Sequence, residues 1–134
     1  MAELSKTIAR ARELGIETIA CADSLAEGTA IAAFRPDILL CEPTDLIGTG
    51  KTADDSYTTS IVAKIRSIDP TIGIMIASGI TTADDVYRVV RLGADGSGAT
   101  SGILSAPDPA QRILEMAEAI VRAAAEREAQ NSAA

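Results

Sequence analysis

The sequence predicts an α/β fold in which one helix precedes four strand–helix units, a (βα)4 half-barrel with a parallel four-stranded sheet. Three observations predict it. Short apolar runs of strand length alternate with amphipathic helical segments, the loops between them are short, and the apolar residues, 47% of the chain, are mostly aliphatic. Four units are half of an eight-unit barrel, so we expect two copies to close as a homodimeric (βα)8 barrel, with a flattened open sheet as the alternative.

The first part of the chain predicts helix, strand and helix in turn. Leu4–Leu14 places its apolar residues on one helical face. The apolar run Ile16–Ala22 predicts the first strand. Asp23 or Ser24 then caps a helix that runs to about Phe34.

The stretch that follows carries the clearest chemical signal. Ile38–Cys41 is a continuous apolar run suited to a buried parallel strand, Glu42 stands where that strand ends, and Pro43 breaks the ladder. Gly48–Gly50 can bring backbone N–H groups close to an anion. A carboxylate at a strand end beside such a loop indicates base chemistry on a phosphorylated substrate, and an ordinary strand-to-helix connection is the alternative.

The remaining segments repeat the alternation. They are a polar loop at Lys51–Ser56, a helix at Tyr57–Ile68, a strand at Ile72–Ala77, a helix capped by Thr81 or Thr82 that runs to about Leu92, a strand within Ala94–Ile103 and a helix from Ala110 to about Arg127. The fourth strand is the weakest because Gly96 and Gly98 lower its strand propensity. We expect one domain over 1–128 and a disordered tail over 129–134.

Composition excludes several classes of partner and site. The net charge of −7 argues against nucleic acid or an anionic membrane as a partner, and an anionic ligand would have to be held by backbone amides and helix N-termini. The chain has no histidine, so we expect no metal site and no cofactor. Cys21 and Cys41 lie in strand-like runs, which indicates reduced thiols in the cytoplasm. The N-terminus is typical of an amphipathic helix, and no apolar run approaches about 20 residues, so we expect no signal peptide.

Glu42–Gly50 reads EPTDLIGTG, which resembles the catalytic-loop signature of triosephosphate isomerase, particularly the compact archaeal type. The similarity runs from about Ala9 to about Ile120, and it includes Ser78–Thr81 and Thr100–Gly102 in the same order. It corresponds to the C-terminal half of that family's TIM barrel, strands five to eight. The family works in glycolysis and gluconeogenesis.

The resemblance implies a role for each matching residue. Glu42 matches the base that moves a proton between adjacent carbons of a three-carbon sugar phosphate. The two ends of the mobile lid that excludes water match Pro43, Thr44, Asp45, Thr49 and Gly50. The backbone phosphate cradle matches Gly48, Gly79, Ile80, Thr81, Thr100 and Ser101.

The departures from the family limit what this chain can do. The family's second catalytic group is a histidine, which is absent here, and its phosphate-steering lysine belongs to the half of the barrel outside the match. We therefore expect a half-barrel that self-assembles and binds phosphate or a triose phosphate with little or no turnover alone.

Two further hypotheses stay open. One is an active isomerase half that requires a complementary N-terminal half chain. The other is a receiver-like signalling module, suggested by PDILLCEP and LGADG. Against the receiver, the acceptor position holds Glu42 instead of aspartate, no lysine follows Ile72–Ala77 before the next helix, and four strands are expected instead of five.

Overall fold

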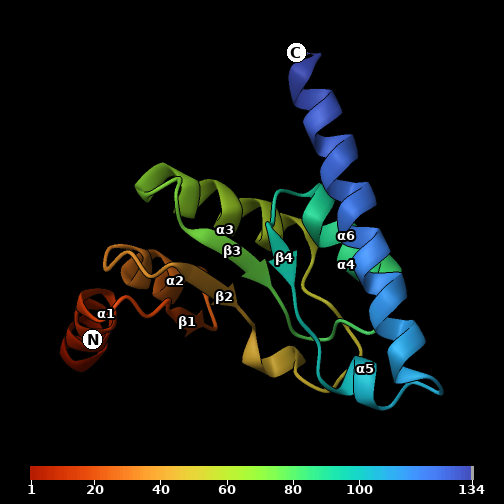
Figure 1. The fold of residues 1–134 in the computed structure, drawn as a ribbon, viewed down its shortest axis with the longest axis horizontal. Helices are drawn as coiled ribbons and strands as arrows, with labels where there is room; N and C mark the ends of the chain where they lie inside the picture. Colours follow the sequence, from red (N-terminus) through yellow and green to blue (C-terminus); the bar gives the residue numbers. More distant parts are fainter. Residues whose placement is uncertain (134) are drawn as a thin grey trace.

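The computed structural model describes residues 1–133, and Figure 1 shows a parallel sheet with the helices that connect and cover its strands. The strands are β1 (Ile19–Ala22), β2 (Ile38–Cys41), β3 (Gly73–Ile76) and β4 (Gly96–Ser97). The helices are α1 (Ala2–Glu13), α2 (Leu25–Ala32), the 3-10 helix η1 (Thr44–Leu46), α3 (Asp55–Ile68), α4 (Ala83–Arg91), α5 (Ser101–Leu104) and α6 (Pro109–Ser132).

The strands lie side by side in the order of the chain, β1-β2-β3-β4, and every pair is parallel. Doubly wound sheets of the flavodoxin type reverse their order at a switch point, and this sheet does not. The predicted (βα)4 arrangement with a parallel four-stranded sheet is therefore confirmed. Closure by a second copy stays a prediction.

Only one face of the sheet is covered by helices. Alternate strand residues such as Ala20, Leu39 and Ile74 are buried, and α2 and α3 contact the strands there. On the opposite face Ile19 is 60% exposed and Cys21 is exposed. In an eight-stranded barrel this second face would line the interior, so the half-barrel leaves apolar strand residues uncovered.

The core between sheet and helices is aliphatic, as the composition predicts. Its largest fully buried side chains include Leu39, Ile61, Ile65, Ile74 and Val89. Each buried side chain of this size contributes about 1.5–3 kcal/mol through removal of its surface from water. The packing of the helices against this face therefore stabilises the sheet, and it holds the strand ends in place.

Several predicted boundaries are wrong; strand β1, for example, begins at Ile19 instead of Ile16. Helix α3 begins at Asp55 because the Asp54 carboxylate accepts a hydrogen bond from the Tyr57 amide at 2.7 Å, so the polar loop is shorter than predicted. Within Ala94–Ile103 only two residues pair as a strand, and the rest form a loop and helix α5. The Thr100 carbonyl accepts hydrogen bonds from the amides that follow it, which turns the chain into that helix.

Helix α6 runs to Ser132 instead of ending near Arg127. Residues 129–132, assigned from sequence to a tail, are helical, and residue 134 lies outside the described residues. The division into one domain over 1–128 and a disordered tail over 129–134 stays a prediction.

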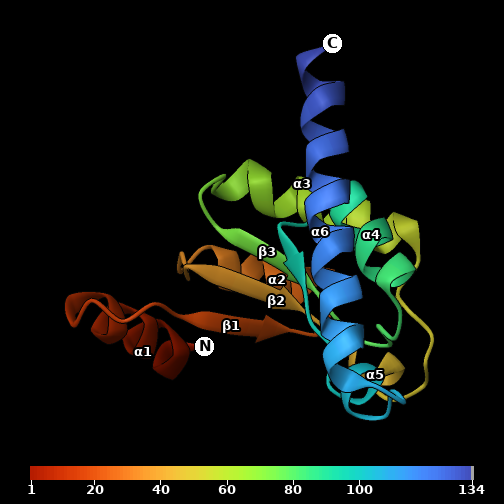
Figure 2. The ribbon, with the colours of Figure 1, turned by 45° about the vertical axis from the view of Figure 1, so that its right-hand side comes forward.

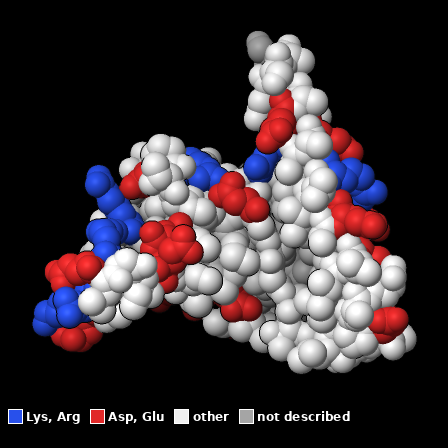
Figure 3. All heavy atoms as spheres, in the orientation of Figure 1, with Lys and Arg blue, Asp and Glu red and all other residues white. Residues whose placement is uncertain are grey.

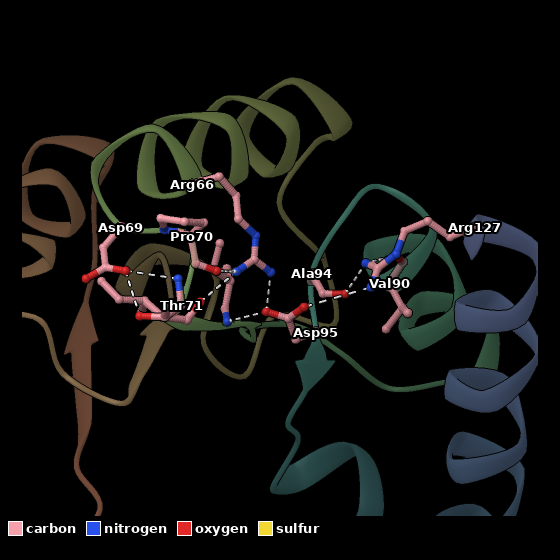
Figure 4. A network of polar contacts seen from close by, with 10 residues as sticks. Arg66, Asp69, Pro70, Thr71, Val90, Ala94, Asp95 and Arg127 are labelled. Carbon is pink, nitrogen blue, oxygen red and sulfur yellow. Dashed lines mark hydrogen bonds and ion pairs between the residues drawn. The ribbon is translucent and has the colours of Figure 1, made fainter. Parts of the chain in front are cut away.

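A polar network ties α6 and α3 to the N-terminal ends of β3 and β4 (Figure 4). The Asp95 carboxylate accepts a hydrogen bond from the Ile74 amide at 2.8 Å and from the Arg66 guanidinium. Arg127 donates to the carbonyls of Val90 and Ala94 at 3.1 and 2.7 Å. The network lies at the N-terminal ends of the strands. The cavity described below opens at their C-terminal ends, so the network supports the fold without occupying the cavity.

Candidate functional site

Glu42 directly follows β2 at the C-terminal edge of the sheet. Its amide donates to the Ala22 carbonyl at 2.8 Å, so the β1–β2 ladder continues up to this residue and fixes its backbone. The side chain lines a cavity of about 340 Å³ at the C-terminal ends of the strands. In the part of the chain that the structure describes, the carboxylate has neither a hydrogen bond nor an ion pair, so it is available to a ligand.

Backbone amides from three loops meet Glu42 in this cavity. Gly48, Gly79, Ile80, Thr100 and Ser101 all line it. Among residues 1–133, none of these five amides donates a hydrogen bond. Backbone N–H groups without a partner at the wall of a cavity can hold an anion without a basic side chain, and no lysine or arginine lines this cavity. The arrangement suits a phosphate group beside a carboxylate base.

Close backbone packing holds these loops in place. A Cβ on Gly79, whose φ is +69°, would overlap the Lys51 carbonyl oxygen, and one on Gly102 would overlap the Ile80 carbonyl oxygen. Ser78 is buried, has a φ of +80°, and donates its hydroxyl to the Pro43 carbonyl at 2.6 Å. The chain after β2 and the chain after β3 are therefore joined at both ends of the Glu42 loop.

Four of the predicted lid residues lie in the exposed part of the Glu42 loop, and the fifth, Pro43, is half-buried. Thr44 and Asp45 lie in η1, and Thr49 donates its hydroxyl to the Leu46 carbonyl at 2.8 Å. Gly50 has a φ of +69°, a conformation that side chains rarely adopt. Local hydrogen bonds thus shape this segment, and their role as lid hinges stays a prediction.

Arg88 anchors the C-terminal end of the same loop. From α4 it donates to the Ala53 carbonyl at 2.9 Å, to the Thr52 hydroxyl and to the Asp55 carboxylate. The guanidinium therefore fixes the point where the loop enters α3. Helix α3 begins at Asp55, three residues after Thr52.

Thr81 differs from the other predicted phosphate contacts because it lies outside this cavity. Its amide and hydroxyl donate to the Asp85 carboxylate at 3.0 and 3.1 Å, and Arg112 donates to its carbonyl. Thr82 and Asp85 complete a capping box at the start of α4. Burial raises the pKa of Asp85, but hydrogen bonds from both threonines outweigh it and hold the pKa below its ordinary value.

Sequence reasoning assigned no role to Ser78, Arg88 or Arg112. Each acts through a contact between segments far apart in the chain, and only Ser78 carries a local signal, its place beside Gly79 at the end of a strand. Among the described residues, no three His, Cys, Asp or Glu side chains converge as metal ligands. No helix in the same range is long and apolar enough to cross a membrane.

Solved structures support the fold. A chain of the Amycolatopsis orientalis BexX/CysO complex superposes with a TM-score of 0.72 over 96% of this chain and 51% of its own, at 18% sequence identity. Nitroalkane oxidase from Streptomyces ansochromogenes superposes with a TM-score of 0.54 over 72% of this chain and 30% of its own, at 23% identity. At such identities the likeness concerns the fold alone.

Sequence comparison is more specific. The triosephosphate isomerase family model matches residues 1–124. The triosephosphate isomerase of Metallosphaera sedula is 35% identical over 95% of this chain and 57% of its own length, and that of Sulfurisphaera tokodaii is 34% identical over 84% and 50%. The chain spans about half the length of these relatives. With the family signature, the half-barrel sheet and the strand-end cavity in agreement, the chain belongs to the triosephosphate isomerase family.

Proposed function

We propose that this chain binds inorganic phosphate or a triose phosphate at the C-terminal edge of its half-barrel. The observation that carries the proposal is the cavity lined by Glu42 and by five residues whose amides donate no hydrogen bond within residues 1–133. The amides would hold the phosphate, and the carboxylate would lie beside the carbon skeleton. Gly48 belongs to the Glu42 loop and Ser101 to the start of α5, so an anion bound to both amides would bridge these two segments.

The chemistry available to Glu42 is proton transfer. A carboxylate can remove a proton from the carbon next to a carbonyl and return it to the neighbouring carbon. The negative oxygen formed in between needs a positioned donor, and the absence of a single such donor typically costs about 3–4 kcal/mol. The chain contains no histidine, and no basic side chain lines the cavity. We therefore propose little or no isomerase turnover by this chain alone.

The uncovered sheet face and the free edges of β1 and β4 support self-assembly as part of the proposal. A second copy would provide four more parallel strands and close an eight-stranded barrel. The two cysteines are free, which agrees with a reducing compartment, and we place the chain in the cytoplasm. The strand order and the family match argue against a receiver-like module.

A second candidate function is an active isomerase half that works with a complementary N-terminal half chain. The observation that favours it is coverage, since the relatives are about twice as long as the matched segment. Such a chain would bring the histidine and lysine that the family resemblance requires. Addition of that half to the purified chain should then produce turnover of glyceraldehyde 3-phosphate.

The binding proposal is tested by amide NMR spectra recorded during titration with inorganic phosphate and with a phosphoglycolate-type analogue. We expect shifts at Gly48, Gly79, Ile80 and Ser101, with Gly15 as a distant control. Unmoved signals at the four cavity amides would overturn the proposal. Turnover by the chain alone that disappears in Glu42→Gln would overturn the inactivity that we propose.

A further inference from the structure

Helix α6 has two apolar faces, and only one of them is used within the chain. Met116, Ala119 and Ala123 are buried, on the side that packs against α4. A second side of the helix, away from this contact, carries Ile113, Leu114 and Val121, which are 51%, 58% and 70% exposed. Figure 3 shows an uncharged strip along α6 between its acidic and basic groups. An amphipathic helix of a globular fold normally buries its whole apolar stripe. The exposed second face is therefore a candidate contact surface, since no described residue covers it.

The second face points toward the free edge of β4. Ile113 and Ala117 line an apolar cavity of about 170 Å³ together with Ser97, Gly98 and Ala99. The cavity therefore lies between α6 and the strand that ends the sheet. A strand added to the edge of β4 would lie beneath this side of the helix.

The other helices show where α6 should pack. In this sheet α2 follows β1 and contacts both β1 and β2, so it covers the groove between its own strand and the next. By the same rule α6, which follows β4, covers the groove between β4 and the strand that pairs with it. In a pair of identical half-barrels that strand is β1 of the second copy, because β1 has the other free edge.

Helix α1 already occupies this place beside β1. Figures 1 and 2 both show it next to β1, on the side away from β2. Ile8 is 4% exposed, Leu4 packs against the core, and Arg12 donates to the Arg35 carbonyl at 2.5 Å. Ile8 is the one buried residue of this helix within the described chain. Few contacts thus hold α1 in place, and it lies where α6 of a second copy would pack beside β1.

Surface area indicates how large the missing contact is. The chain exposes 7555 Å², whereas a folded monomer of 13.8 kDa is expected to expose about 6,600 Å². The excess of about 900 Å² matches the area of about 800 Å² that each partner buries in a standard interface. An interface with a second copy of the chain would therefore be large enough to cover a surface of this size.

We propose that the second apolar face of α6 packs beside β1 of a second copy, and that α1 must leave this position before the two half-barrels close. The inference rests on the self-assembly proposed above and is independent of phosphate binding. Helix α1 then acts as a displaceable cover, and its few contacts set the affinity of the dimer.

The dimer dissociation constant, measured by sedimentation equilibrium on the full chain, tests the proposal. The double substitution Ile8→Ala with Arg12→Ala releases α1, and we expect a dissociation constant about tenfold lower, which corresponds to about 1.4 kcal/mol of α1 docking. Leu114→Glu, which would place a charge in the proposed contact of α6 with the second copy, should raise the dissociation constant about tenfold or more. Lys6→Ala and Ala129→Glu, at exposed positions of the same two helices, are matched controls and should leave it unchanged.

If the double variant associates no more strongly than the original chain, the proposal fails. Hydrogen exchange on the unmodified chain gives a second readout that does not depend on how a variant folds. As the concentration rises through dimerisation, we expect the α1 amides to exchange faster and the α6 amides more slowly. Slower exchange in α1 would show that α1 belongs to the interface and would overturn the proposal, whatever the outcome of phosphate titration.

Discussion

At the scale of single residues, Glu42 and the amides around it make opposite demands on a ligand. The amides attract an anion, and the carboxylate in the same cavity repels it. The proposed base therefore weakens the binding of a bare phosphate, and the rest of a sugar phosphate would have to compensate. This opposition gives a direct test of whether phosphate enters the cavity.

Glu42→Gln should tighten the binding of inorganic phosphate about fivefold, because removal of a like charge at this range contributes about 1 kcal/mol. Amide NMR titration or calorimetry at low salt measures the change. Asp45→Asn is the matched control, since Asp45 is exposed in η1 and does not line the cavity. Equal affinities for Glu42→Gln and the original chain would place the phosphate elsewhere.

Two glycines with nearly the same φ should respond differently to alanine. Gly48 has open space around its Cβ position, so Gly48→Ala should lower the free energy of unfolding by about 1–2 kcal/mol through backbone strain alone. At Gly79 the new methyl would also overlap the Lys51 carbonyl oxygen, so Gly79→Ala should cost clearly more. Urea unfolding compares the two variants, and similar losses would contradict the loop packing described for Gly79.

Asp85 should make stability depend on acid pH. Its pKa is lowered in the folded state, so its contribution is fully present above the unfolded-state pKa of about 3.9 and is lost as the pH falls through the folded value. Asp85→Ala should cost about 1 kcal/mol at pH 7 and much less once the carboxyl is protonated in both states. Urea unfolding at pH 7 and at a pH below the folded-state pKa measures the two costs, with Asp84→Ala as the neighbouring control. A cost that does not change with pH would contradict the assigned role.

At the scale of elements, the sequence predicted segments whose signals are local. The bounds of β2 agree with the apolar run between Asp37 and Glu42, and Thr82 is the cap of α4. The fourth strand predicted within Ala94–Ile103 is confirmed as β4, but its short length and helix α5 were missed because glycine and serine lower strand propensity without indicating what replaces the strand.

Prediction of the candidate site divides in the same way. Glu42 and Gly48 belong to one motif, and the cavity unites them. The contacts that hold the loops, Ser78 with Pro43 and Arg88 with Thr52, join segments that sequence periodicity cannot relate. Such contacts depend on how the strands are ordered, so they become visible only in the folded chain.

Arg88 gives the prediction that belongs to this scale. Arg88→Ala should free the start of α3, so that amides over 52–58 exchange hydrogen about tenfold faster while those of β2 and β3 stay unchanged. Lys64→Ala, at an exposed position of α3, is the control. Unchanged exchange over 52–58 would show that the loop end is held without the guanidinium.

At the scale of the whole molecule, the two cysteines report on opposite faces of the sheet. Burial raises the pKa of Cys41 to about 12, so this thiol should stay unreactive at neutral pH. Cys21 is exposed on the uncovered face, which would become the interior of a closed barrel.

A thiol reagent should therefore modify Cys21 alone, and more slowly as the protein concentration rises through dimerisation. The rate of absorbance change with a chromogenic disulfide measures this, and Cys21→Ser should abolish the reaction. A Cys21 rate that does not depend on concentration, in samples shown by sedimentation to be dimeric, would contradict closure over this face.

The agreement between strand order and chain order has a consequence for synthesis. Each strand pairs with the strand made just before it, so a chain that emerges from the ribosome can add one strand and one helix at a time to a growing edge. Each strand after β1 finds a partner that has already been made, and the closure of long loops is avoided. Strand–helix units appended at the last edge of such a sheet would therefore leave the pairing of the earlier strands unchanged.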